Sequence, residues 1–168
     1  MLTNIILTAL VSTPAAPSAL HARIERAVLH GDASSLQQVR KDLDREAATT
    51  ERAGTRYLKA YLNWRIGQTM WAASGVKVER ERLLKEARKQ LEAHLKKHAQ
   101  DGEAQALLAT ILGELIAGDS ERAPKLGRQS VELMAQAATN TPESPRVALM
   151  RGIWFLFMPA MYGGGLDR

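Results

Sequence analysis

Glycine and proline stand far apart over most of this 168-residue chain, and that spacing limits the fold more than any other feature. From Leu20 onward the residues between them are mostly Ala, Leu, Glu, Lys, Arg and Gln, which favour helices, and β-branched clusters are few. The breaks lie at intervals typical of globular helices. The sequence therefore predicts an all-α fold with helices over 20–30, 34–49, 51–73, 78–99, 103–117, 123–139 and 145–158.

Polar residues ahead of these segments are typical helix caps. Asp32 stands before the second helix, Asp101 stands before the fifth, and Pro145 suits a first helical turn. Within the fourth helix apolar side chains recur at helical spacing, which predicts one buried stripe. The stripe consists of Leu84, Ala87, Leu91 and Leu95.

Similar helix pairs recur along the chain. The segment AQALLATILG (104–113) matches PRVALMRGI (145–153) in its Ala-Leu-Leu and Ala-Leu-Met triplets, which lie 42 residues apart. Leu91 and Leu133, in the helices before these segments, are separated by the same interval, and YLKAYLNWRIG (57–67) has a related composition. Helix pairs that repeat about every 40 residues predict an α-solenoid.

This pattern resembles that of tetratricopeptide-repeat (TPR) proteins. Trp64 and Gly67 match the aromatic and glycine positions of the first helix of a unit, with Ile66 at the leucine position, and Pro142 and Pro145 lie where units join. The stretch PRVALMRGIWFLFMPAMYGGG also resembles exported bacterial TPR-like proteins, in which a proline and a glycine-rich loop separate the two helices of a unit. The resemblance implies antiparallel helix pairs stacked as a short TPR-like α-solenoid. The repeat departs from the family in being longer than about 34 residues and in lacking the second-helix aromatic.

Charge and composition exclude several functions. The net charge of +5 comes from 23 basic and 18 acidic residues that are interspersed, which is typical of a mixed surface rather than of a nucleic-acid site. The chain contains no cysteine, which excludes disulfides, thiolate catalysis and cysteine-based zinc sites. It also contains no nucleophile elbow, no zinc-hydrolase motif and no dinucleotide fingerprint, so we expect no catalysis and no cofactor.

The first 18 residues have the order of a secretory signal peptide. They carry no charged side chain, and an apolar run over 5–11 precedes a small, proline-rich stretch over 12–19. Cleavage after Ala15 or Ser18 would leave a single helical-repeat domain over about 19–168. We expect a periplasmic or secreted protein, with a cytoplasmic protein as the alternative. The apolar run is too short for a stable membrane span.

One candidate binding surface lies on the third predicted helix. Its aromatic side chains follow helical spacing, and polar residues stand between them: Tyr57, Tyr61, Trp64, Arg65, Gln68 and Trp71. A stripe of this kind is usually part of the core. The first helices of solenoid units, however, line the concave face, where these residues would form an aromatic groove. The sequence leaves both interpretations open.

Two further motifs have a structural interpretation. His94 and His98 have the spacing of two metal ligands on one helix, but lysines surround them and no third ligand is marked. We therefore expect solvated histidines and no metal site. The triple glycine over 163–165 lacks the Lys-Ser or Lys-Thr that ends a phosphate loop, which favours a turn between helices.

The last predicted helix ends in consecutive apolar residues over 153–158, so no single face can bury them. The preceding helix can cover one side through Val131, Leu133 and Met134. We expect either that the repeat is truncated at its C-terminal end, or that its open side drives self-association. At least one of three aromatic side chains should then be partly exposed: Trp154, Phe155 and Phe157.

Together these observations favour an exported helical-repeat scaffold that mediates protein–protein interaction without catalysis, cofactor or metal. The expected partner is a protein rather than a nucleic acid. A small-ligand-binding solenoid that uses the aromatic groove is the alternative.

Overall fold

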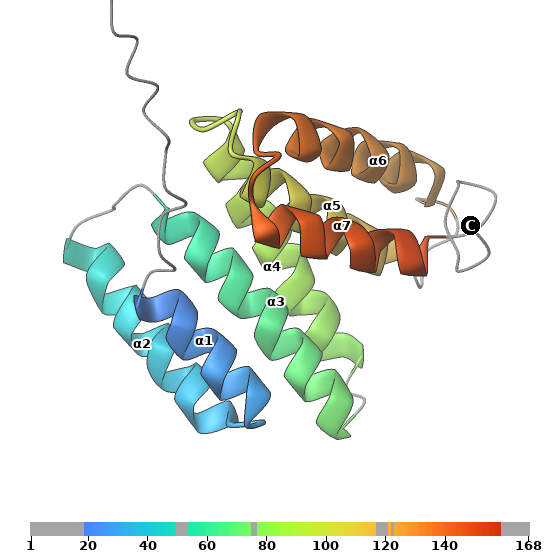
Figure 1. Ribbon diagram of the computed structural model, residues 1–168. Helices are drawn as coiled ribbons and strands as arrows, with labels where there is room; N and C mark the ends of the chain where they lie inside the picture. The colour runs from blue at the N-terminus through green and yellow to red at the C-terminus, as the bar shows by residue number, and fades with distance from the viewer. Residues whose placement is uncertain (1–18, 50–53, 75–76, 117–120, 122, 159–168) are drawn as a thin grey trace, which may run out of the picture.

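The computed structural model describes residues 19–49, 54–74, 77–116, 121 and 123–158. These ranges contain seven helices and no strand, so the all-α prediction is confirmed (Figure 1). The helices are α1 (Ala19–Leu29), α2 (Ala33–Thr49), α3 (Thr55–Ser74), α4 (Lys77–Leu95), α5 (Gly102–Ile116), α6 (Ala123–Asn140) and α7 (Pro145–Phe157). The predicted signal peptide and the triple glycine lie outside the described residues.

The helices begin where the sequence places their caps. The side chain of Asp32 accepts the backbone N–H of Ser35 at 3.0 Å, and that of Asp101 accepts the N–H of Ala104 at 3.0 Å. Ser144 caps α7 through the N–H of Val147, with Pro145 in the first turn. These bonds satisfy N–H groups that have no partner within the helix.

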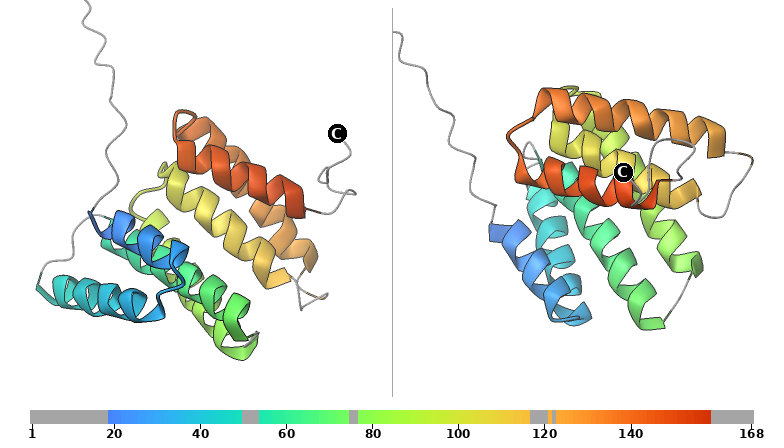
Figure 2. Two further views of the ribbon diagram at one scale, coloured as in Figure 1. Left: turned by 60° about the horizontal axis from the view of Figure 1, so that its bottom comes forward. Right: turned by 45° about the vertical axis from the view of Figure 1, so that its right-hand side comes forward.

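Neighbouring helices contact one another along the whole described chain. In addition, α1 contacts α3, α3 contacts α5, and α5 contacts α7, whereas the described even-numbered helices do not contact one another. Figure 2 shows α1, α3, α5 and α7 following one another across the molecule, with α7 at one outer edge. We call these four helices the odd-helix layer.

Helix α5 lies at the centre of the core. It contacts α3, α4, α6 and α7, and residues 104–112 are buried on every side of it. Alanines at 104, 106 and 109 leave room for neighbouring helices on these sides. The predicted stripe of α4 is also confirmed, since Leu84, Ala87 and Leu91 are buried and Leu95 is partly buried.

The packing of α7 was only partly predicted. Met134 of α6 is buried and Leu133 partly buried, but Val131 is 42% exposed, so the prediction that Val131 covers α7 is wrong. Instead, Ser130 provides the contact, and its Oγ accepts a hydrogen bond from Trp154 Nε1 at 2.8 Å. Phe155 is 39% exposed, which confirms the expected exposure of an aromatic side chain at this end. The side chain of Phe157 lies outside the described residues.

None of the described helices combines the length and the hydrophobicity that crossing a bilayer requires.

Candidate functional site

Three aromatic side chains of α3 lie inside the protein. Tyr57, Tyr61 and Trp64 are buried, and neighbouring ring centroids in this series are 6.1 and 5.6 Å apart. His21 of α1 adds a fourth buried ring, with its centroid 4.3 Å from that of Tyr61. The side chain of Trp71 lies outside the described residues. The described rings therefore form a packed cluster between α1 and α3.

Each of these three α3 rings uses its polar atom within the protein. The hydroxyl of Tyr61 donates to Glu25 Oε1 at 2.6 Å, and Trp64 Nε1 donates to Glu114 Oε1 at 2.7 Å. The hydroxyl of Tyr57 lies 3.5 Å from a carboxylate oxygen of α5. Burial raises the pKa of Tyr57 and of Tyr61 well above the usual range, so both phenols stay protonated.

At the rim of this cluster, Arg65 and Gln68 are half-buried. Both carboxylate oxygens of Glu25 bind the guanidinium of Arg65, through Nε and Nη2 at 3.0 Å each. Arg65 Nη1 also donates to Gln68 Oε1 at 2.7 Å. The fork-like pair fixes the direction of both side chains across α1 and α3. Of the predicted groove, Arg65 and Gln68 therefore form a polar rim over buried rings.

A second ion pair joins α5 to α7 on the same layer. Glu103 accepts hydrogen bonds from Ser144 Oγ at 2.7 Å and from Arg146 Nη1 at 2.6 Å. The side chains of Glu103 and Arg146 are about one-quarter exposed. Sequence reasoning missed this pair and Glu25, because their partners lie far away in the sequence and no local motif marks them. The layer thus presents two compensated charge pairs beside buried aromatic rings.

The imidazole of His21 is buried between these two pairs. Burial lowers the pKa of His21, the nearby positive charge of Arg146 lowers it further, and the carboxylates of Glu25 and Glu103 only partly oppose these effects. Arg65 also contributes a small lowering effect. The folded state therefore favours neutral His21.

We expect this burial to make the protein less stable in mild acid. Above the ordinary histidine pKa of 6.5, the imidazole of His21 is neutral in both the folded and the unfolded state, so its burial does not reduce the free energy of unfolding. As the pH falls below 6.5, His21 binds a proton more readily in the unfolded chain than in the folded protein, so the free energy of unfolding decreases. The decrease ends once the pH is below the lowered pKa of His21 in the folded protein. Urea unfolding at about pH 7.5 and about pH 5 measures the loss.

His21→Gln should reduce that pH-dependent loss, whereas the same change at exposed His30 should leave it as in the wild type. Equal pH dependence in the His21 variant and the wild type would show that other groups cause the loss.

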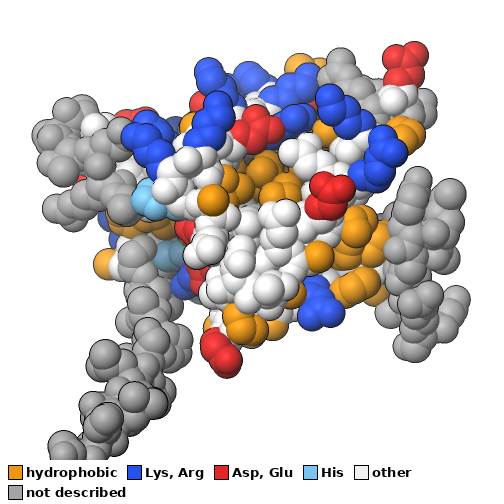
Figure 3. Space-filling view, turned by 90° about the horizontal axis from the view of Figure 1, so that it is seen from above, with side chains coloured by type: hydrophobic (Ala, Val, Ile, Leu, Met, Phe, Trp, Pro, Cys, Tyr) orange, Lys and Arg blue, Asp and Glu red, His pale blue; other side chains and the backbone are white. Residues whose placement is uncertain are grey.

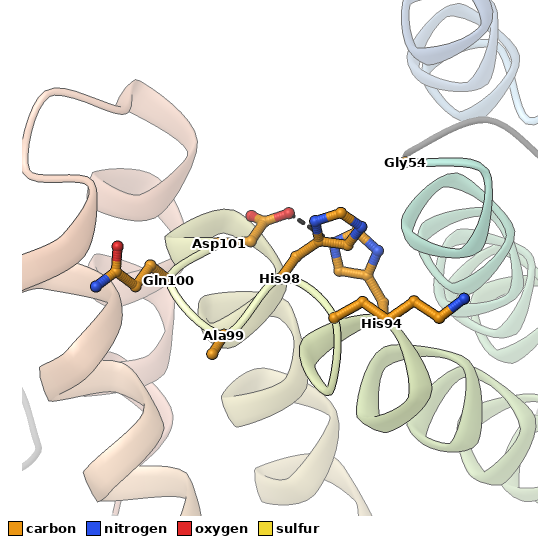
Figure 4. A pocket seen from close by; sticks show the side chains of 7 residues that line it. Gly54, His94, His98, Ala99, Gln100 and Asp101 are labelled. Carbon is orange, nitrogen blue, oxygen red and sulfur yellow. Dashed lines mark hydrogen bonds and ion pairs between the residues drawn. The ribbon is translucent and has the colours of Figure 1, made fainter.

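A hollow of about 780 Å³ lies beside the turn that joins α4 to α5 (Figure 4). His94, Lys97, His98 and Asp101 line it, and Gly54 at the start of α3 lies on the opposite side. His94 Nε2 is 2.7 Å from Asp101 Oδ2, and the ring centroids of His94 and His98 are 4.6 Å apart.

The prediction that the two histidines are both solvated is wrong for His94, which is buried. Helix α4 ends at Leu95, and the turn after it brings Asp101 back to His94. Burial opposes ionisation of Asp101, but bonds from His94 and from the N–H of Ala104 outweigh it, so its pKa lies below the usual range. His94 thus ties the capping residue of α5 to α4.

Within the described part of the chain, the histidine pair does not belong to a larger ligand cluster. Among the described residues, no group of three or more His, Asp and Glu side chains is arranged to hold a metal ion. The pair therefore has the geometry of a structural link between α4 and α5.

Comparison with protein-family models, with curated proteins and with solved structures finds no match for this chain.

Proposed function

We propose that this chain is an exported helical-repeat scaffold that binds a protein partner and performs no catalysis. In this proposal TPR-like antiparallel helix pairs stack as a short α-solenoid, and the odd-helix layer is its binding face. The contact pattern supports it: α1, α3, α5 and α7 touch in sequence, while α2, α4 and α6 do not touch one another in the described chain. Helical-repeat proteins commonly use such a continuous layer for binding.

The chemistry of the layer favours a protein partner over a small ligand. Tyr57, Tyr61 and Trp64 are buried, and their polar atoms face carboxylates of the same chain, which leaves little aromatic surface for a ligand. The rim carries charged and amide groups that remain partly accessible, notably Glu25, Arg65 and Gln68. A polar rim over a rigid base suits recognition of a protein surface.

A charge exchange tests the proposed face while keeping its ion pair. Glu25→Arg combined with Arg65→Glu should retain the pair between α1 and α3 but reverse the charges that a partner meets. The exchange also removes the carboxylate that accepts the hydroxyl of Tyr61, so we expect a folded protein of lower stability than the wild type. At a temperature where it is folded, it should lose a partner that the wild type retains from the export compartment of the source organism. Quantitative affinity purification measures that retention.

The matched control is Glu81→Lys combined with Lys85→Glu on the exposed surface of α4, where the two residues form an ion pair at 2.7 Å. This exchange should leave partner retention unchanged. Equal retention by both exchanged proteins would contradict the proposed face. A metabolite that changes tryptophan fluorescence at low concentration would instead support the small-ligand alternative.

Export makes a separate prediction about the N-terminus. We expect cleavage after Ala15 or Ser18, because uncharged apolar residues precede small ones there. N-terminal sequencing of protein from a bacterial host's periplasm measures it. A protein that keeps Met1 and stays in the cytoplasmic fraction would contradict export but would leave the binding face to be judged by the charge exchange.

A further inference from the structure

A series of hydrogen-bonded polar side chains crosses α3 from α2 to α4. Arg40 of α2 donates from Nη2 to Asn63 Oδ1 at 2.5 Å. Asn63 of α3, which is buried, donates from Nδ2 to Gln90 Oε1 at 3.2 Å, and Gln90 of α4 donates from Nε2 to Glu86 Oε1 at 3.2 Å. Helices α2 and α4 both contact α3 but not each other, so this series links them (Figure 1). We call these four residues the polar bridge.

Arg40 uses little of its hydrogen-bonding capacity in the polar bridge. A guanidinium has five N–H donors, and the neutral amide of Asn63 accepts one of them. No other hydrogen bond or ion pair joins Arg40 to the described residues. Arg40 and Asn63 lie well within their helices, roughly 12–14 Å along the axis from the ends at Thr49 and Thr55. The bond to Asn63 thus holds a planar group whose remaining donors are open to a ligand.

The carboxylates nearest to Arg40 are engaged by other cations. Asp44 pairs with Lys59 at 2.7 Å, and Glu79 pairs with Arg82 at 2.7 Å. Together with Arg40, these groups carry three positive and two negative charges, so one positive charge is in excess. Burial lowers the pKa of Arg40, the positive charge of Arg82 lowers it further, and Asp44 and Glu79 oppose these effects only in part. The half-buried charge of Arg40 is therefore not neutralised within the described chain.

Positive charge at the surface does not by itself mark a binding site. Figure 3 shows Lys and Arg side chains gathered along one edge of a face, with acidic side chains between them. Arg40 differs because it is half-buried, held in a fixed direction and joined through the polar bridge to a hollow of about 320 Å³. Glu86 and Gln90 of the bridge line this hollow, where Lys89 offsets the charge of Glu86. The hollow gives room for the rest of a ligand that Arg40 holds.

The guanidinium of Arg40 suits a carboxylate. Arginine binds a carboxylate through two parallel N–H bonds, and one excess positive charge is matched by one carboxylate. A phosphate group would bring close to two negative charges into the neighbourhood of Asp44, Glu79 and Glu86, which repel the second one. The charge balance therefore favours a single carboxylate over phosphate.

We infer that Arg40 anchors a binding site for one carboxylate group, supplied either by a small free acid or by an acidic side chain of a protein. This site involves α2, α3 and α4, goes beyond the proposed binding face on the odd-helix layer and does not depend on it. A single charge-assisted pair at a partly exposed site binds weakly, so the ligand is detected by titration to high concentration.

Heteronuclear NMR of the full chain, titrated with sodium acetate at constant ionic strength, tests the site. Acetate should shift the signals of Arg40 Nε–H and of the Asn63 side-chain amide saturably, whereas acetamide, a neutral molecule of similar shape, should not. A terminally blocked peptide with one glutamate should shift the same signals. Tighter binding of the peptide than of acetate would assign the site to an acidic protein segment, and weaker binding would assign it to a free acid.

Variants separate Arg40 from general surface charge. Arg40→Gln can still donate to Asn63 but has no charge, so acetate binding followed at the Asn63 amide should weaken at least tenfold. The matched control is Lys41→Gln, the same change of charge at the next, exposed residue of α2, which should bind acetate as the wild type does. Equal acetate affinity of the two variants would overturn the inference. So would equal shifts with acetate and acetamide in the wild type, or shifts that do not saturate.

Discussion

Trp64→Ala should lower the free energy of unfolding by about 3–5 kcal/mol. The indole is buried next to Tyr61, and its removal leaves a cavity that the ring cluster between α1 and α3 cannot readily fill. The substitution also removes the hydrogen bond that Trp64 Nε1 donates to Glu114. The partly buried carboxylate of Glu114 then keeps its ion pair with Arg80. Urea unfolding of wild type and variant at neutral pH measures the difference.

Trp64→Phe separates the packing of the ring from its hydrogen bond. Phenylalanine keeps most of the buried apolar surface but cannot donate to Glu114, so its stability should lie clearly between those of the wild type and Trp64→Ala. A Trp64→Ala protein within about 0.5 kcal/mol of the wild type would place the indole outside the core. A stable Trp64→Ala protein that no longer binds a small ligand that the wild type binds would support the aromatic-groove alternative.

Gly102→Ala should cost about 1–3 kcal/mol, an unusually large effect for the addition of one methyl group. Gly102 begins α5 directly against the end of α6. A Cβ at this position would contact Thr141 Oγ1 and would lie 2.7 Å from Thr141 Cβ and 2.9 Å from the backbone oxygen of Ala137. Since one of these atoms belongs to the α6 backbone, relief requires α5 and α6 to separate, and the bond from Gly102 N–H to Thr141 Oγ1 weakens.

Gly113→Ala is the matched change in the same helix. A Cβ there meets no atom of the described residues within 4 Å, so alanine should leave stability unchanged or raise it by about 0.5–1 kcal/mol through its better helix propensity. Thermal and urea unfolding of the two variants compare the sites directly. A similar response to alanine at both positions would contradict the close approach of α5 and α6.

The helices themselves could be predicted from sequence because their determinants are local. Asp32 and Asp101 satisfy N–H groups only three residues away, and Pro145 acts within its own turn. The spacing of the aromatic residues on α3 likewise predicts a common face, but it does not decide whether this face belongs to the core or lines a groove. In the structure His21 of α1 packs against Tyr61, so the burial of this face depends on a helix that spacing within α3 does not reveal.

The polar contacts could not be predicted, because they join distant segments. Tyr61 and Glu25 are 36 residues apart, and Trp64 and Glu114 are 50 apart. The burial of His94 likewise depends on another helix. His94 lies within α4, three residues after buried Leu91, and its ring centroid is 6.5 Å from that of Tyr57 in α3. Asp101, in the turn after α4, completes the contacts of His94. The contact with Tyr57 joins segments that are 37 residues apart, so the spacing of the two histidines alone could not predict the burial of His94.

Native-state hydrogen exchange of the full chain tests the stacked architecture most directly. A stack in which helices depend on their neighbours should open from its ends. The free energy of opening should therefore be highest for the amides of α5 and several kcal/mol lower for those of α1, α2 and α7. The intermediate helices α3 and α4 should show intermediate protection. Uniform protection of all seven described helices, with exchange only by global unfolding, would contradict a repeat scaffold and indicate one closed cooperative bundle.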